Sequence, residues 1–488
     1  MQDRKTVSIC SLKQFPPPAG EDYVTIYEKG GSLFHEPLAE AINYGKSLRF
    51  PQVNISQELS RPSMSRESAK SAFLDCGGKP SLTQIWQEDG LHGIISSVLE
   101  DHPENSKLKS YIKKSIECLL SYISNSPIAN DRLLSKISTN NNWKSGSVRC
   151  LDWHTFADKL AICFKDDTIK IYSCQTKVIS VTPLLKHNKQ VNVCKIAWRP
   201  YIASVLAVGC ENGILIWKID PTSLASRPTN MELLEGHKPI CDIVWHPYGN
   251  LLASASPIDN SVMVWDVELG RREPLKRFGG GVSLLRWSDD GSRLLSSYTS
   301  SLFRVWDTQT WQYEKWSLSG RGSMTAACWN KNRLIFANDS QPYLHCIVFH
   351  NAENCTSEIG SMQCIDVTTC TTNTMSGEEV RVGGIVRDIK WTSERLAVLF
   401  RETSFVALFS TSTRPSFSVL PIGFVRGPNN SIPMLIDLKS NSGKGIILTM
   451  IWSEDTLTYI PLCTSTEENT IYESFTEFEP SAIYSTVM

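Results

Sequence analysis

The sequence predicts an all-β protein built as a seven-bladed β-propeller with a small N-terminal helical segment, and three observations support this fold class. First, tryptophans that end alternating apolar runs recur at intervals of 45, 47, 42, 42 and 62 residues. Second, another aromatic residue follows each of these tryptophans after 18 to 20 residues. Third, a short β-rich run lies between the two aromatics of a pair. Such a repeat of about 40–45 residues is typical of a propeller blade.

Two Trp-Asp dipeptides identify the repeat as the WD40 type. The third unit also carries polar residues at suitable positions, and we expect His237, Ser254 or Ser256, Asp259 and Trp265 to form a hydrogen-bond chain within one blade. The other units lack this full set. The residues predicted to have structural roles in the propeller are Trp153, Trp198, Trp217, His237, Trp245, Ser254, Ser256, Asp259, Trp265, Asp266, Trp287, Trp306, Asp307, Trp329 and Trp391.

The seventh unit lacks a tryptophan at the expected position. Aligning Leu438, which lies 47 residues after Trp391, with the tryptophans leaves room for a middle and a third strand, so the propeller is predicted to span 143–463. Its outer strand must come from elsewhere, because a propeller closes by completing the sheet of its last blade. Residues 23–28 and 470–475 both show the alternation of a strand, and we favour 23–28.

The segments around the propeller have different compositions. Residues 1–79 include a proline run and a Ser/Arg-rich stretch, and we expect extended or flexible chain apart from the closing strand. In 80–138 the apolar residues recur at helical spacing, which predicts two or three helices that pack on the propeller or bind a partner. Residues 351–384 are rich in Thr, Ser and Glu and are predicted to form a long loop. The tail 464–488 has five glutamates and no basic residue.

Composition excludes several functional classes. The chain has 488 residues, a formal net charge of −1 and a pI near 6.8, so we expect no direct binding of nucleic acid. No apolar run is long enough to span a membrane, and the N-terminus shows no signal peptide. The 15 cysteines form no CxxC pair, which is typical of reduced, buried cysteines in an intracellular protein.

The sequence contains no motif of the common enzyme classes. A nucleotide-binding loop, a zinc-protease motif and a nucleophile elbow are all absent, and we predict no catalytic, cofactor-binding or metal-binding residues. A propeller enzyme would need carboxylates or histidines at matching positions of several blades, and the repeat alignment shows none. The expected role is therefore an interaction scaffold.

Several segments resemble the aladin family of WD-repeat nucleoporins. They include 203–217, the Asp-Pro-Thr-Ser-Leu linker within 220–228, 251–259, and the Gly-Gly-Gly-Val crossing within 278–282. The linker and the crossing are not general WD40 features, so the resemblance is specific.

The resemblance implies a scaffold or adaptor of the nuclear pore complex that supports nucleocytoplasmic transport and spindle assembly. The implied partners are a transmembrane nucleoporin that anchors the protein at the nuclear envelope, other nucleoporins and a mitotic spindle kinase. The implied location is the nuclear pore, with cytoplasm and spindle poles in mitosis. The alternative is a WD-repeat scaffold or substrate receptor of a signalling or ubiquitin-ligase complex unrelated to the pore.

Overall fold

The computed structural model describes residues 10–41 and 147–463, apart from 174–182, 221–227, 229, 277–280, 319–321, 350–360, 393, 413–416 and 442–444. The chain divides into two units, residues 1–56 with 141–488 and residues 57–140. The predicted helical segment 80–138 and the acidic tail 464–488 lie outside the described residues.

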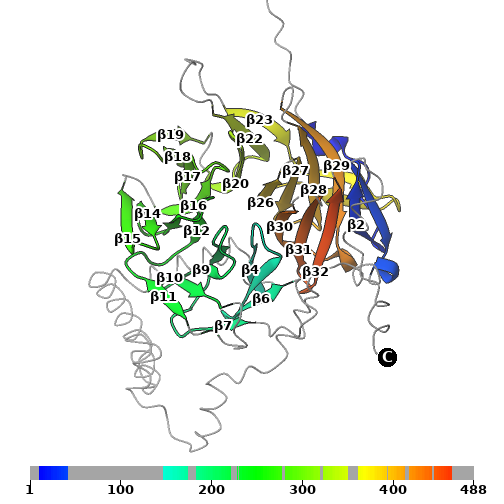
Figure 1. Ribbon diagram of the computed structural model, residues 1–488. Helices are drawn as coiled ribbons and strands as arrows, with labels where there is room; N and C mark the ends of the chain where they lie inside the picture. Colours follow the sequence, from blue (N-terminus) through cyan, green and yellow to red (C-terminus); the bar gives the residue numbers. More distant parts are fainter. Residues whose placement is uncertain are drawn as a thin grey trace, which may run out of the picture. The chain divides into compact units, whose positions relative to one another are not determined.

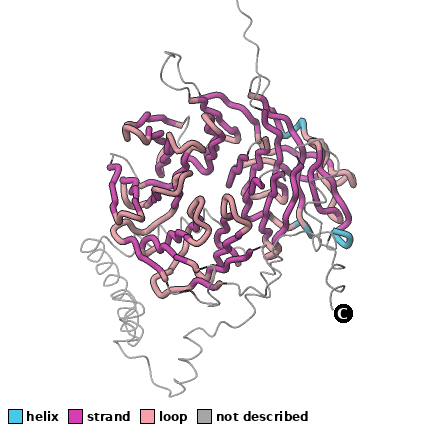
Figure 2. Tube along the Cα trace, in the orientation of Figure 1, coloured by secondary structure: helices cyan, strands magenta, loops and turns pink. Residues whose placement is uncertain are grey.

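Seven mainly antiparallel sheets follow one another around a ring, each forming one blade (Figures 1 and 2). Blade one contains β4 (Val148–Trp153), β5 (Lys159–Phe164), β6 (Ile169–Ser173) and β7 (Leu184–Leu185). Blade two contains β8 (Lys195–Trp198), β9 (Val205–Cys210), β10 (Gly213–Lys218) and β11 (Met231–Leu234). Blade three contains β12 (Asp242–Trp245), β13 (Leu251–Ala255), β14 (Ser261–Asp266) and β15 (Arg271–Lys276). Blade four contains β16 (Val282–Trp287), β17 (Arg293–Tyr298), β18 (Leu302–Asp307) and β19 (Tyr313–Ser317).

The remaining blades use strands from more distant parts of the chain. Blade five contains β20 (Met324–Asn330), β21 (Arg333–Asn338), β22 (Tyr343–Val348) and β23 (Ser361–Asp366), with β1 (Cys10–Ser11) paired to β23. Blade six contains β26 (Val386–Thr392), β27 (Arg395–Phe400), β28 (Phe405–Ser412) and β29 (Ser418–Arg426). Blade seven contains β30 (Pro433–Asn441), β31 (Gly445–Trp452) and β32 (Leu457–Cys463), completed by β2 (Tyr23–Lys29) and β3 (Ser32–Pro37).

The burial of each strand depends on its place in the blade. Second strands such as β9 are buried along their whole length, because neighbouring blades cover both of their faces. Outer strands such as β15 are largely exposed and carry charged residues. The tryptophan of an inner strand pairs with a leucine of the second strand. Trp153 of β4 lies opposite Leu160, and Trp198 of β8 lies opposite Leu206. In blade seven, Leu438 lies opposite Leu448.

The segment 351–384, which we predicted to be a single long loop, contains three strands. One is β23, and the other two, β24 (Cys370–Asn373) and β25 (Glu379–Val382), form a separate hairpin. The prediction was wrong because an outer strand exposes one face to water and therefore tolerates the Thr, Ser and Glu that are typical of loops.

Residues Cys10–Pro37 cross blades five, six and seven, and we call this segment the N-terminal strap (Figure 1). At its start, β1 pairs with β23 of blade five. Phe15 then packs against Phe409 and Phe424 of blade six, with ring centroids 5.0 and 4.6 Å apart. At its end, β2 pairs in parallel with β32, so residues 23–28 lie in the outer part of blade seven. A short 3-10 helix, η1 (Leu12–Gln14), lies within the strap, and a second, η2 (Pro428–Asn430), follows β29.

Candidate functional site

A chain of polar side chains connects the strands of blade three. The Trp265 Nε1–H donates to Ser254 Oγ at 2.9 Å, and Ser254 Oγ lies 2.7 Å from His237 Nδ1. His237 Nε2 faces Asp259 at 3.9 Å. Of the two serines considered, Ser254 takes part in the chain, whereas Ser256 accepts from the Ile258 N–H at 3.4 Å. Burial lowers the pKa of His237 to about 4, so its ring is neutral at pH 7 and acts in packing and hydrogen bonding.

Other blades keep parts of this arrangement. In blade four, the Trp306 Nε1–H donates to Ser296 Oγ at 2.8 Å, and in blade two the Trp217 Nε1–H donates to Gln190 Oε1 at 3.0 Å. The aspartates of the two Trp-Asp dipeptides stabilise turns, since Asp266 accepts from the Leu269 N–H and Asp307 from the Gln309 N–H. The third-strand tryptophans therefore act within their own blades.

The inner-strand tryptophans instead connect neighbouring blades. In four of the six, the Nε1–H donates to the backbone carbonyl that precedes the inner-strand tryptophan of the blade before it, at 3.1–3.2 Å. The four pairs are Trp198 with Asp152, Trp245 with Ala197, Trp287 with Val244, and Trp329 with Arg286. At the ring closure, the Trp153 Nε1–H donates to Thr449 Oγ1 of blade seven at 2.9 Å. Trp391 differs, because its Nε1–H donates to Thr411 Oγ1 of its own blade.

Four inner strands carry carboxylates, which corrects the expectation that no such residues recur between blades. Asp152 and Asp437 lie one residue before the tryptophan position, and Asp242 and Asp388 lie three residues before it. Residues one and three positions away share a face of a strand, because side chains alternate with a period of two. A fixed-spacing comparison can find each pair but does not show that the two pairs share a face.

These carboxylates are occupied by structural contacts. Asp152 Oδ2 accepts from the Trp198 N–H at 2.7 Å, and Asp242 Oδ2 accepts from the Leu285 N–H at 2.9 Å. Each therefore binds the inner strand of the following blade. Ion pairs add to these contacts, with Arg286 Nη1 2.8 Å from Asp242 Oδ2 and Lys390 Nζ 3.1 Å from Asp437 Oδ1. The arrangement joins blades to one another.

One member of this set has an altered acidity. Burial, and secondly the nearby carboxylate of Asp437, raise the pKa of Asp152 to about 7.

Within the described ranges, no group of three or more His, Cys, Asp or Glu side chains is placed to hold a metal ion.

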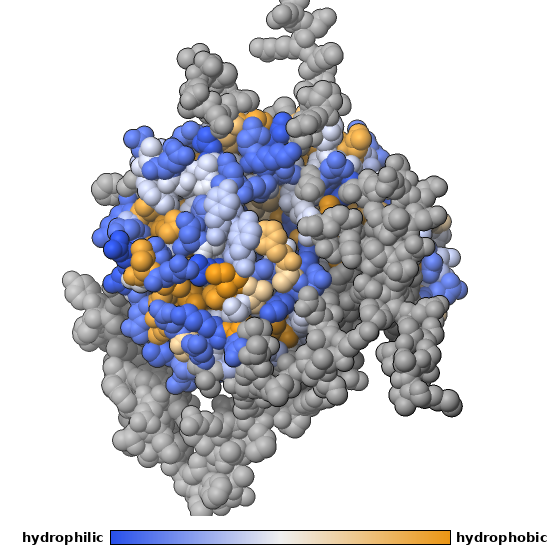
Figure 3. Space-filling model, viewed as in Figure 1, coloured by the Kyte–Doolittle hydropathy of each residue, from blue (hydrophilic) through white to orange (hydrophobic). Residues whose placement is uncertain are grey.

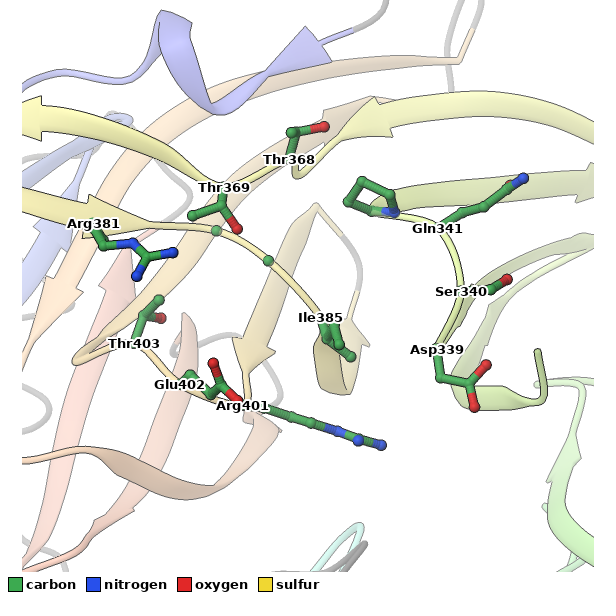
Figure 4. Close-up of a pocket in the computed structure, with 13 residues that line it drawn as sticks. Asp339, Ser340, Gln341, Thr368, Thr369, Arg381, Ile385, Arg401, Glu402 and Thr403 are labelled. Carbon is green, nitrogen blue, oxygen red and sulfur yellow. The ribbon is translucent and has the colours of Figure 1, made fainter. Parts of the chain in front are cut away.

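A pocket of about 410 Å³ lies between blades five and six (Figure 4). It is formed by the turns between the second and third strands of both blades and by the chain that joins β23 to β26. The lining residues are Asp339, Ser340, Gln341, Pro342, Thr368, Thr369, Arg381, Gly383, Gly384, Ile385, Arg401, Glu402 and Thr403. Sequence reasoning did not find this pocket, because its residues come from two separate turns and from the chain that joins β23 to β26.

Exposed aromatic residues lie at matching turns of the first three blades. Phe156, Tyr201 and Tyr248 each follow an inner-strand tryptophan by three residues and are 59, 62 and 65% exposed. The rings of Phe156 and Tyr201 stack with centroids 4.4 Å apart. We call these three residues the aromatic turn surface. Exposed apolar groups that gather on one side of a protein are typical of a binding surface for another protein.

The face of the ring shown in Figure 3 is hydrophilic over much of its rim, with hydrophobic residues exposed toward its middle. Among the residues that the structure describes, no helix has the length and apolar character that crossing a bilayer requires.

Comparison with known proteins identifies a family over most of the chain. The family model of the aladin seven-bladed propeller matches residues 129–463. Aladin of Arabidopsis thaliana is 27% identical over 340 residues, which cover 62% of this chain and 73% of that protein. The coronin-like protein crn1 of Schizosaccharomyces pombe is 31% identical over 120 residues, which cover 23% of this chain and 20% of that protein.

Among solved structures, the β-propeller domain of Myceliophteria thermophila Cps50 (Swd1) superposes with a TM-score of 0.48 at 13% identity, covering 64% of this chain and 96% of that domain. The family model carries the assignment, because it matches well over half of the chain in the region that forms the seven blades. This protein therefore belongs to the aladin seven-bladed propeller family.

Proposed function

We propose that this protein is a non-enzymatic scaffold or adaptor of the nuclear pore complex, held at the nuclear envelope by a transmembrane nucleoporin. Membership of the aladin family supports the proposal. In this role the protein supports nucleocytoplasmic transport and, in mitosis, spindle assembly, with other nucleoporins and a spindle kinase as further partners.

The structural observation that carries a scaffold role is the aromatic turn surface. Phe156, Tyr201 and Tyr248 are presented at equivalent turns of a ring whose blades are joined by hydrogen bonds between inner strands. Large exposed rings on a rigid support suit protein binding, because little conformational entropy is lost when they become buried. The carboxylates of Asp152 and Asp242, by contrast, are engaged in contacts between blades.

Imaging of the tagged full-length chain in interphase cells after detergent extraction tests the pore role. We expect a punctate nuclear rim that persists after extraction. A diffuse, fully extractable signal would contradict the pore role and favour the signalling or ubiquitin-ligase alternative, which affinity purification would then examine.

A second comparison tests the surface. Replacing Phe156, Tyr201 and Tyr248 by Ser should abolish rim retention while leaving the melting temperature within a few degrees of the unmodified chain. The matched control replaces three other exposed apolar residues by Ser, namely Ile258, Met375 and Leu420. If both variants stay at the rim, the envelope anchor binds elsewhere on the protein.

A further inference from the structure

The pocket between blades five and six contains two cationic side chains that are free to bind a ligand. Figure 4 shows Arg381 extending between Thr369 and Thr403, and Arg401 extending past Ile385 toward the side that Asp339 lines. Among the described residues, neither guanidinium has a carboxylate within ion-pairing distance. Arg401 Nε is buried and donates to no acceptor in this part of the chain. An unsatisfied buried donor is costly, so a bound acceptor would stabilise this site.

The acidic residues of the pocket do not neutralise these arginines directly. The two carboxylate oxygens of Asp339 accept from the N–H and the hydroxyl of Ser323, at 2.8 and 3.1 Å. Glu402 is exposed on the rim. Within the described residues, the two guanidinium groups of the pocket therefore keep N–H donors that neither of its two carboxylates accepts from.

We propose that this pocket binds the acidic C-terminal segment of the same chain, residues 464–488, through charge-assisted hydrogen bonds from Arg381 and Arg401. The segment has five glutamates and no basic residue, so its charge complements the two arginines. Arg binds carboxylates in a bidentate geometry, so each of the two guanidinium groups can bind one glutamate side chain.

The position of the segment makes this binding possible. It follows Cys463, the last residue of β32 in blade seven, and blade seven is the neighbour of blade six around the ring. A chain of 25 residues can span roughly 80–90 Å when extended. Cys463 lies at the end of β32 opposite the turn 453–456, whereas the pocket lies at the equivalent turns of blades five and six, so the segment must cover the length of a seven-residue strand, about 23 Å, as well as the width of a four-stranded blade, about 15 Å. The segment can thus reach from blade seven to the pocket without strain.

A peptide-binding experiment tests the proposal on the full-length chain. In the test protein, Gln replaces Glu467, Glu468, Glu473, Glu477 and Glu479, so that its own tail no longer competes for the pocket. The probe is a fluorescently labelled synthetic peptide of residues 464–488 with its native glutamates, and binding is followed by fluorescence anisotropy. We expect saturable binding that weakens with added salt.

Variants of the pocket locate the binding. On the same background, Arg381→Gln and Arg401→Gln should each weaken peptide binding by about tenfold or more, because each removes charge-assisted hydrogen bonds. The control is Arg271→Gln, which changes an exposed arginine on the outer strand of blade three. Arg381 is exposed, so its variant is expected to keep the melting temperature of the parent chain and to remain informative if Arg401→Gln impairs folding.

Three results would overturn the proposal. The first is equal binding to the pocket variants and to the Arg271→Gln control, or no binding at all. The second is equal binding by a peptide that carries Gln in place of all five glutamates. The third is equal affinity for the unmodified chain and for the chain with the glutamine tail, which would assign the pocket to an acidic segment of another protein.

Discussion

At the level of single residues, one hydroxyl group decides whether the polar chain of blade three exists. Ser254 Oγ accepts from the Trp265 indole N–H and contacts the His237 ring, so two side chains from different segments depend on it. Ser256 lies two residues further on, is equally buried, and makes a longer bond to a nearby backbone N–H. The two serines offer a comparison in which burial is matched and hydrogen bonding differs.

We predict that Ser254→Ala lowers the free energy of unfolding by about 1–3 kcal/mol, because it leaves the buried Trp265 donor and the His237 nitrogen without partners. Ser256→Ala should cost less, since only the Ile258 N–H loses an acceptor. Urea unfolding monitored by tryptophan fluorescence measures both effects. Equal losses for the two variants would contradict the assigned role of Ser254.

The acidity of Asp152 gives a pH-dependent prediction. Its pKa is about 7 in the folded protein and near 3.8 in the unfolded chain, so the folded state binds the extra proton between these values. Stability that depends on Asp152 therefore falls as the pH rises from about 4 to 7. Asp152→Asn keeps an acceptor for the Trp198 N–H and removes this dependence, so the variant should gain stability relative to the parent chain as the pH rises.

Urea unfolding of both proteins between pH 5 and pH 8 checks this prediction. The lowered pKa of His237 acts in the opposite direction, adding stability as the pH rises from about 4 to 6.5. Because His237 is present in both proteins, its contribution cancels in the difference. A difference in stability that stays constant across this range would show that Asp152 is already ionised in the folded protein at pH 5.

At the level of structural elements, the N-terminal strap is held by polar contacts as well as by strand pairing. Glu28 of β2 forms a bidentate ion pair with Arg395 of β27, with oxygen–nitrogen distances of 2.9 and 3.1 Å. Their side chains are 0 and 5% exposed. Thr25 Oγ1 accepts from the Arg426 N–H, and the Arg426 guanidinium donates to the Ala19 carbonyl. The strap thus binds blade six laterally while it completes blade seven.

We predict that Glu28→Gln lowers the free energy of unfolding by about 3 kcal/mol, because it leaves the buried Arg395 cation without its counter-charge. The control is Glu232→Gln, which breaks an exposed pair with Lys218 and should cost about 1 kcal/mol or less. Chemical unfolding of the two variants separates these values. If Glu28→Gln proves as mild as the control, the ion pair does not hold the strap.

At the level of the whole molecule, the sequence predicted the parts of the ring that repeat. Tryptophans such as Trp198 and Trp245 mark each inner strand, and alternation marked residues 23–28 as a strand. The contacts that occur once were not predictable. Glu28 and Arg395 are 367 residues apart, and no local pattern relates them. The pocket likewise depends on how two blades lie side by side, which repeat spacing does not specify.

Closure of the ring gives the last prediction. Without residues 1–41, blade seven would keep only β30, β31 and β32, and the edge of β32 would lose its partner. An unpaired edge invites pairing with another chain, and loss of the strap also uncovers Phe409 and Phe424. We expect the shortened chain to unfold at lower urea concentration and to self-associate in size-exclusion chromatography with light scattering. A chain that lacks 464–488 serves as control and should remain monomeric, because the strap still covers β32. If the chain without the strap is also monomeric and its urea unfolding midpoint is unchanged, the inner-strand hydrogen bonds alone hold the ring closed.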